Sequence, residues 1–186
     1  MEIYLSRPLI GFIFVTQINT MRILFTLLIL VGSISLYAQN NELDERNGFK
    51  NIKLLSKATD YPELKFDKQQ AEEFKAIYVS KPGYLESIGD IQIKDFKAYT
   101  YKDLIYQIEI ITNKEPELFK GLEAAFGNAK FSVVGNEYVW QGTKVKLTYS
   151  SIKGGKKTIM TYSAPEIKDI IKQDEQAEIK QLSEDF

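Results

Sequence analysis

The chain of 186 residues contains no cysteine and no histidine. These two absences exclude disulfide bonds, thiolate nucleophiles, imidazole general bases and zinc sites built from Cys or His ligands. Without cysteine the protein also has no residue for the lipid attachment of a bacterial lipoprotein. The sequence therefore predicts no catalytic residues of these common kinds, no metal and no cofactor, and it favours a protein that is not an enzyme.

A charge excess of either sign is also lacking, because 24 Lys and Arg residues stand against 25 Asp and Glu residues. Proteins that bind the phosphate backbone of nucleic acids carry a basic excess on the binding face. The charge balance therefore predicts no nucleic-acid partner.

Long hydrophobic runs are scarce, and the most apolar one, Ile23–Val31, ends at Gly32. It is too short to cross a bilayer core of roughly 30 Å, which needs about 20 residues. A basic residue precedes the run, and small residues up to Ala38 follow it, which is the order of a secretory signal. We therefore predict a Sec-type signal peptide over residues 21–38, cleavage between Ala38 and Gln39, and a periplasmic or secreted protein with no membrane span after cleavage.

A second apolar patch, Leu9–Val15, precedes this signal. If translation starts at Met1, the two patches form a long signal or an anchor with Arg22 near its middle, where a charge costs about 2.5 to 3.5 kcal/mol on insertion scales. A start at Met21 avoids that cost. Residues 1–20 are therefore interpreted as an over-extended gene start.

The remainder has the length of one domain. Residues 39–47 are polar and without pattern, which predicts a flexible lead-in to a single domain at 48–186. Gly48–Leu55 has the alternation of a short strand. The apolar residues of Ser56–Ile77 fit a helical spacing only loosely, and this segment is predicted to be partly helical.

A period of two makes residues 104–112 the best predicted strand. The set that is expected to face the core is Leu104, Tyr106, Ile108 and Ile110, which alternate with Ile105, Gln107, Glu109 and Ile111. The short link Lys102-Asp103 predicts a hairpin over residues 95–112. Two further hairpins are predicted with Gly142 in one turn and Gly154-Gly155 in the other, each glycine supplying a positive φ.

Two helices are predicted after these strands. The segment from Glu115 has Pro116 in its first turn and Gly127 at the position of a C-terminal cap. A second helix of about 163–182 begins with Ser163 as cap and becomes polar toward its end. The expected fold is α+β: an antiparallel sheet built of hairpins, with one or two helices packed on it and a C-terminal amphipathic-to-polar helix.

Aromatic residues are abundant, with 11 Tyr and 11 Phe, although Trp140 is the only tryptophan. Tyr138 shares a strand face with Trp140, and such a pair either packs in the core or forms a binding platform. The candidate binding residues are Trp140 and Tyr138, together with Tyr99 and Tyr101 on an earlier strand.

Acidic residues provide the only alternative chemistry. Glu86 and Asp90 lie in one loop, and Glu109 lies on the best strand. A carboxylate-dependent hydrolase of the cell envelope requires such groups to converge in a cleft, with one in an apolar setting that raises its pKa.

Several segments together resemble a family of small uncharacterised exported proteins of Gram-negative bacteria. They are DERNGFKNIKL from Asp44 to Leu54, SIGD at 87–90, YTYKDLIYQIEI, the helix end AAFG and YVWQGTKVKLTYS. The chain departs from that pattern at Leu55, where a glycine is usual. The resemblance implies no activity and no functional residues.

These observations favour an exported, non-enzymatic module that binds a protein, peptide or glycan of the envelope or extracellular space through its sheet face or hairpin tips. The hydrolase is the alternative. In a third possibility, the polar C-terminal helix docks on a partner protein.

The signal interpretation predicts the N-terminus of the exported protein. Expression in a Gram-negative host followed by N-terminal sequencing should give a mature chain that begins at Gln39, because the small residue Ala38 occupies the cleavage position. A mature chain that begins earlier would contradict this interpretation.

Overall fold

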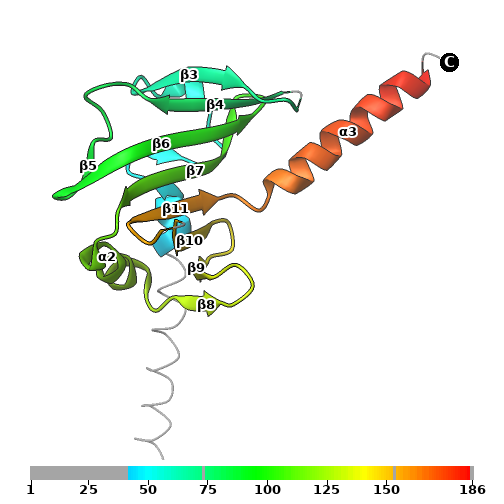
Figure 1. Cartoon of the computed structure of the whole chain (residues 1–186). Helices are drawn as coiled ribbons and strands as arrows, with labels where there is room; N and C mark the ends of the chain where they lie inside the picture. The colour runs from blue at the N-terminus through cyan, green and yellow to red at the C-terminus, as the bar shows by residue number, and fades with distance from the viewer. Residues whose placement is uncertain (1–41, 73, 153, 185–186) are drawn as a thin grey trace, which may run out of the picture. The chain divides into compact units, whose positions relative to one another are not determined.

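The computed structural model describes residues 42–184 except 73 and 153 (Figure 1). The predicted signal at 21–38, its Ala38–Gln39 junction and residues 1–20 lie outside the described residues. The described strands are β1 (Gly48–Phe49), β2 (Ile52–Lys53), β3 (Leu64–Gln69), β4 (Lys75–Ser80), β5 (Ser87–Ile88), β6 (Ile91–Tyr101), β7 (Leu104–Asn113), β8 (Lys130–Ser132), β9 (Glu137–Gln141), β10 (Lys146–Ser151) and β11 (Lys157–Ser163). The helices are η1 (Ala58–Asp60), α2 (Pro116–Phe126) and α3 (Ile167–Glu184), and residues 42–46 are also helical.

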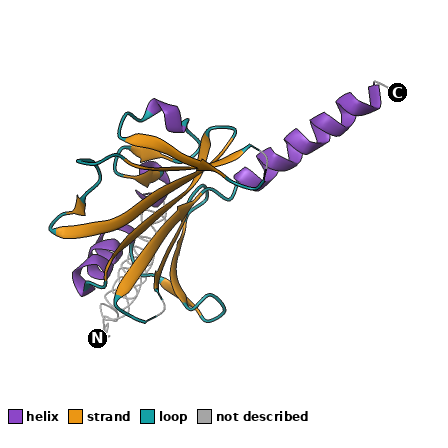
Figure 2. Cartoon of the chain, turned by 45° about the horizontal axis from the view of Figure 1, so that its top comes forward, coloured by secondary structure: helices purple, strands orange, loops and turns teal. Residues whose placement is uncertain are grey.

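The main sheet has the strand order β3-β4-β6-β7-β11-β10-β9-β8, with β5 paired to the beginning of β6. All of its neighbouring strands are antiparallel, and β1 and β2 form a separate two-stranded hairpin. Figure 2 shows these strands in orange, with the helices at their periphery. The predicted α+β class and the antiparallel sheet built of hairpins are confirmed.

The central strands have one apolar face, as the alternation in residues 104–112 predicts. Ile108 and Ile110 on β7 are fully buried, and each such aliphatic side chain contributes about 1.5–3 kcal/mol on burial. Two rows of paired residues cross the sheet on this face: Phe96, Ile110, Met160, Tyr149 and Tyr138, and beside them Ala98, Ile108, Tyr162, Leu147 and Trp140. These rows form the floor of the hydrophobic core.

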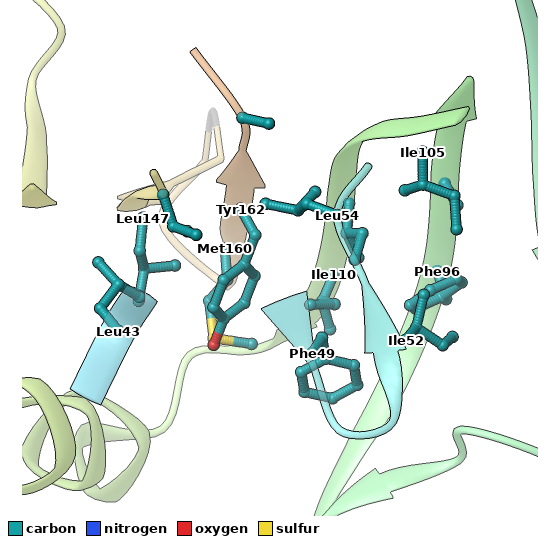
Figure 3. Close-up of a cluster of buried hydrophobic side chains, with 14 of the residues drawn as sticks. Leu43, Phe49, Ile52, Leu54, Phe96, Ile105, Ile110, Leu147, Met160 and Tyr162 are labelled. Carbon is teal, nitrogen blue, oxygen red and sulfur yellow. The ribbon is translucent and has the colours of Figure 1, made fainter. Parts of the chain in front are cut away.

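The core face is covered by two separate elements. The β1–β2 hairpin supplies Phe49 and Ile52, and Figure 3 shows these two side chains beside Phe96 and Ile110. Helix α2 covers another part with its stripe of Leu118, Leu122 and Phe126. Pro116 at the start of α2 and the positive φ of Gly127 at its end confirm the predicted helix limits.

The segment 56–77 differs from the prediction of partial helix. Its described residues form the short η1, then β3, the edge strand of the sheet, and the beginning of β4. Leu64 is the only buried residue of β3, so this strand lacks the alternation of a strand with one buried face. Just before this segment, Leu55 has a φ of +59°, which explains why a glycine suits that position.

The predicted flexible lead-in at 39–47 also requires correction, because residues 42–46 are helical and Leu43 is buried in the core. Asp44 accepts hydrogen bonds from three backbone N–H groups of the β9–β10 turn: Thr143 at 2.7 Å, Lys144 at 2.9 Å and Val145 at 3.0 Å. The Thr143 hydroxyl donates a fourth bond. This Asp44 clamp fastens the start of the domain to a turn about 100 residues later.

Gly142 is required by the Asp44 clamp, and the prediction that it supplies a positive φ is wrong. Positive φ values occur at Gly154 and Gly155 in the next turn but not at Gly142. A Cβ atom on Gly142 would lie 2.2 Å from Oδ1 of Asp44. The glycine therefore makes room for the carboxylate.

Helix α3 begins at Ile167 and not at Ser163, whose hydroxyl donates to the carbonyl of Lys146 on β10. Ile167 is its only buried residue. Figure 1 shows α3 extending from β11 away from the sheet, as expected for a helix that becomes polar toward its end. None of the described helices combines the length and the apolar character that a membrane span requires.

The Asp44 clamp predicts a stability effect that depends on pH. Replacing Asp44 by Ala should lower the free energy of unfolding by about 2 kcal/mol, because three backbone N–H groups lose their acceptor. Burial raises the pKa of this carboxyl, but the bonds from Thr143, Lys144 and Val145 lower it by more, so the net pKa lies below its usual 3.8. The stabilisation is therefore present above pH 3.8 and is lost as the pH falls through the folded-state pKa.

Urea unfolding between pH 2 and pH 7 tests this effect. The wild type should lose more stability on acidification than Asp44→Asn, which has no carboxylate to protonate. Asp90→Asn, at an exposed aspartate, should follow the wild-type curve. Equal acid sensitivity of Asp44→Asn and the wild type would contradict the role of the clamp.

Candidate functional site

A cleft of about 630 Å³ opens where the two covers of the core face leave a gap. Its walls come from four parts of the chain: the β1–β2 hairpin with the preceding helical turn, the β5–β6 turn, helix α2 and strand β11. This volume lies within the range of about 300–1,000 Å³ that is typical of small-molecule sites. The cleft is the candidate functional site.

The walls of the cleft are mainly apolar. Leu118, Leu122 and Phe126 line it from α2, and Phe49 lines it from the hairpin. Met160 on β11 is fully buried beneath them. A ligand in the cleft would therefore exchange water for aliphatic and aromatic contacts.

Gly121 lies in the middle of α2 and lines the cleft. A glycine inside a helix is less stable than alanine by roughly 0.5–1 kcal/mol. A Cβ atom at this position would meet no atom within 4 Å, so packing does not require the glycine. Its effect is to keep the wall of the cleft free of a side chain.

Tyr162 carries the most buried polar group of the cleft. The residue is 4% exposed, and no hydrogen bond joins its hydroxyl to another residue that the structure describes. Every fully buried side-chain nitrogen or oxygen of the described residues has a partner, so this hydroxyl is open to the cleft. Figure 3 shows its ring beside Phe49 and Met160. Burial raises the pKa of Tyr162 to about 12, against an opposing effect of the positive charge of Arg46. The phenol is therefore protonated and can donate a hydrogen bond at neutral pH.

Two cationic side chains and one carboxylate also line the cleft. The guanidinium of Arg46 lies 5.2 Å from the centre of the Phe126 ring, and its Nε donates to Glu42 at 2.8 Å. Lys50 donates to the carbonyl of Ser87 at 2.8 Å and so connects the hairpin to β5. The carboxylate is Glu117, in the first turn of α2.

The sequence-predicted aromatic residues Trp140 and Tyr138 lie on the core face but outside the cleft. Trp140 is buried, and its Nε1 donates to the carbonyl of Gly127 at 2.7 Å. It is therefore a core residue, and the binding-platform alternative for Trp140 is wrong. Tyr138 is 39% exposed on β9, next to the edge strand β8. The centre of its ring lies 4.6 Å from that of Phe119 and 5.2 Å from that of Phe131.

The other two candidates, Tyr99 and Tyr101, lie on the opposite face of the sheet, by the alternation of β6. The Tyr99 hydroxyl donates to Glu109 at 2.8 Å. Burial is the larger cause and this bond the second cause of a raised pKa of Tyr99. Tyr101 is buried and donates to Asp174 of α3; burial and then this bond raise its pKa. The structure thus separates the four aromatic candidates and does not assemble them into one surface.

The three acidic candidates do not share a cleft environment. Glu86 and Asp90 are exposed in the loop around β5, and Glu86 accepts a bond from the N–H of Gly83. Glu109 instead accepts bonds from Tyr99 and Gln107 on the open face of the sheet. No group of three acidic side chains close enough to hold a metal ion occurs among the described residues.

Sequence reasoning did not identify the cleft residues Arg46, Lys50, Gly121 and Tyr162. They come from segments more than a hundred residues apart in the sequence, and no local motif connects them. The one available signal was Gly121, an unfavourable residue inside an otherwise strong helix pattern.

Comparison with known proteins identifies no relative: no family model matches the chain, and neither a curated protein nor a solved structure matches it.

The open space at Gly121 predicts that Gly121→Ala raises the free energy of unfolding by about 0.5–1 kcal/mol, because alanine is the better helix former. Thermal or urea unfolding measures the change. The same substitution at Gly142 is the matched control and should destabilise the protein, because its Cβ would displace Asp44. A loss of stability in Gly121→Ala would show that the wall of the cleft is closed in solution.

Proposed function

We propose that this chain is an exported, non-enzymatic binding module and that the cleft beside α2 holds a small, mainly apolar ligand. The observation that carries the proposal is the combination of an apolar cleft of about 630 Å³ with a helix glycine that packing does not require. Stability alone favours a side chain at Gly121. Retention of an open wall at a cost in stability is characteristic of functional sites.

The remainder of the proposal rests on the sequence. The signal features of residues 21–38 support export. The absence of cysteine and histidine, together with the separate locations of Glu86, Asp90 and Glu109, supports binding as opposed to catalysis. Binding of a small molecule in the cleft replaces the expectation of an aromatic sheet-face platform, because Trp140 is buried.

A fluorescent probe tests whether the cleft binds apolar molecules. The uncharged dye N-phenyl-1-naphthylamine, titrated into the mature chain, should show a saturable rise in fluorescence as it leaves water. Gly121→Trp should abolish this signal, because the indole would occupy the cleft. Lys120→Trp is the control: it places the same ring on the same helix, at an exposed position that does not line the cleft.

Circular dichroism and thermal unfolding establish that both variants are folded. If folded Gly121→Trp binds the dye as the wild type does, or if the wild type gives no saturable signal, the cleft is not the binding site.

A further inference from the structure

The polar groups of the cleft identify a ligand class more narrowly than its apolar walls do. Tyr162 lines the cleft, and its hydroxyl makes no hydrogen bond to another described residue. A ligand that covers this hydroxyl must accept its hydrogen bond, because a polar group that loses water without gaining a partner is costly. The ligand therefore carries an acceptor at this position.

Arg46 adds a charge that matches such an acceptor. Only its Nε is used, in the bond to Glu42, so its two terminal NH₂ groups remain available within the described part of the chain. Arg46 and Tyr162 both line the cleft. A guanidinium and a hydroxyl donor that face one cleft suit a carboxylate.

The remaining charged groups of the lining limit the charge of the ligand. Lys50 contributes a second cation. Within the described structure its ammonium group donates one hydrogen bond, to the carbonyl of Ser87. Glu117 contributes one carboxylate on the α2 side. Two cations and one carboxylate in the lining complement a ligand with a single negative charge. A second negative charge on the ligand would be repelled by Glu117.

Provided that the cleft is the binding site proposed above, we propose that its ligand is an apolar monocarboxylic acid, with the chain or ring against α2 and the carboxylate between Tyr162 and Arg46. The carboxylate accepts a hydrogen bond from the Tyr162 hydroxyl and pairs with the guanidinium of Arg46. The apolar part contacts Leu118, Leu122 and Phe126 and passes Gly121, where no side chain obstructs it.

The test compares a fluorescent fatty acid, cis-parinaric acid, with its uncharged methyl ester at pH 7.5. The wild type should bind the acid at least about tenfold more tightly than the ester, because a hydrogen bond to a charged group contributes more than a neutral one. Arg46→Gln should reduce this acid-to-ester ratio toward one. Tyr162→Phe should weaken binding of the acid about tenfold.

Stability without ligand distinguishes a binding role of Tyr162 from a structural one. Since the hydroxyl makes no hydrogen bond in the described structure, Tyr162→Phe should unfold at the same temperature as the wild type or higher. Tyr99→Phe is the control. It removes a hydroxyl that bonds to Glu109 on the opposite face, so it should lower stability and leave the acid-to-ester ratio at the wild-type value.

The outcomes separate the two proposals. If acid and ester bind equally well, or if Arg46→Gln and Tyr162→Phe keep the wild-type preference for the acid, the ligand class is wrong while the cleft remains a binding site. If Gly121→Trp binds both probes as the wild type does, or if neither probe binds the wild type, the proposed function itself fails and the ligand class falls with it.

Discussion

One apolar sheet face, covered by two elements with a cleft between them, is the constraint on which the rest of this structure depends. The rows through Ile108 and Ile110 cross five strands, yet the described covers are an 11-residue helix and a hairpin of two-residue strands. Covers of this size leave apolar surface between them. The cleft is therefore a consequence of the architecture, and its chemistry is set by the few side chains that reach the gap.

The sequence predicted those parts of the fold in which local pattern and tertiary environment agree. Strand β7 alternates because one of its faces is buried, and α2 has its apolar stripe, its early proline and its terminal glycine in the expected order. Strand β3 was not predicted because an edge strand with few buried side chains does not show apolar alternation in its sequence. Its Phe66, for example, is 56% exposed beside Tyr78. The helical turn at 42–46 escaped because only Leu43 in it is apolar, and its stabilising partners lie far along the chain.

The candidate site was less accessible to sequence reasoning than the fold. Aromatic abundance directed attention to Trp140 and Tyr101, which are both buried for structural reasons: one bonds to the end of α2 and the other to α3. Tyr162 resembles any other strand tyrosine in the sequence. Only the three-dimensional structure distinguishes a tyrosine whose hydroxyl is bonded from one whose hydroxyl is not.

The Asp44 clamp also affects the order in which the chain can acquire its structure. Its carboxylate bonds to residues 99 to 101 positions later, so closing this contact requires a long loop to lose its conformational freedom. Until synthesis has passed Val145, the beginning of the domain lacks the partner that fixes it. Contacts of such sequence separation slow folding, so the clamp closes only after most of the domain has been synthesised.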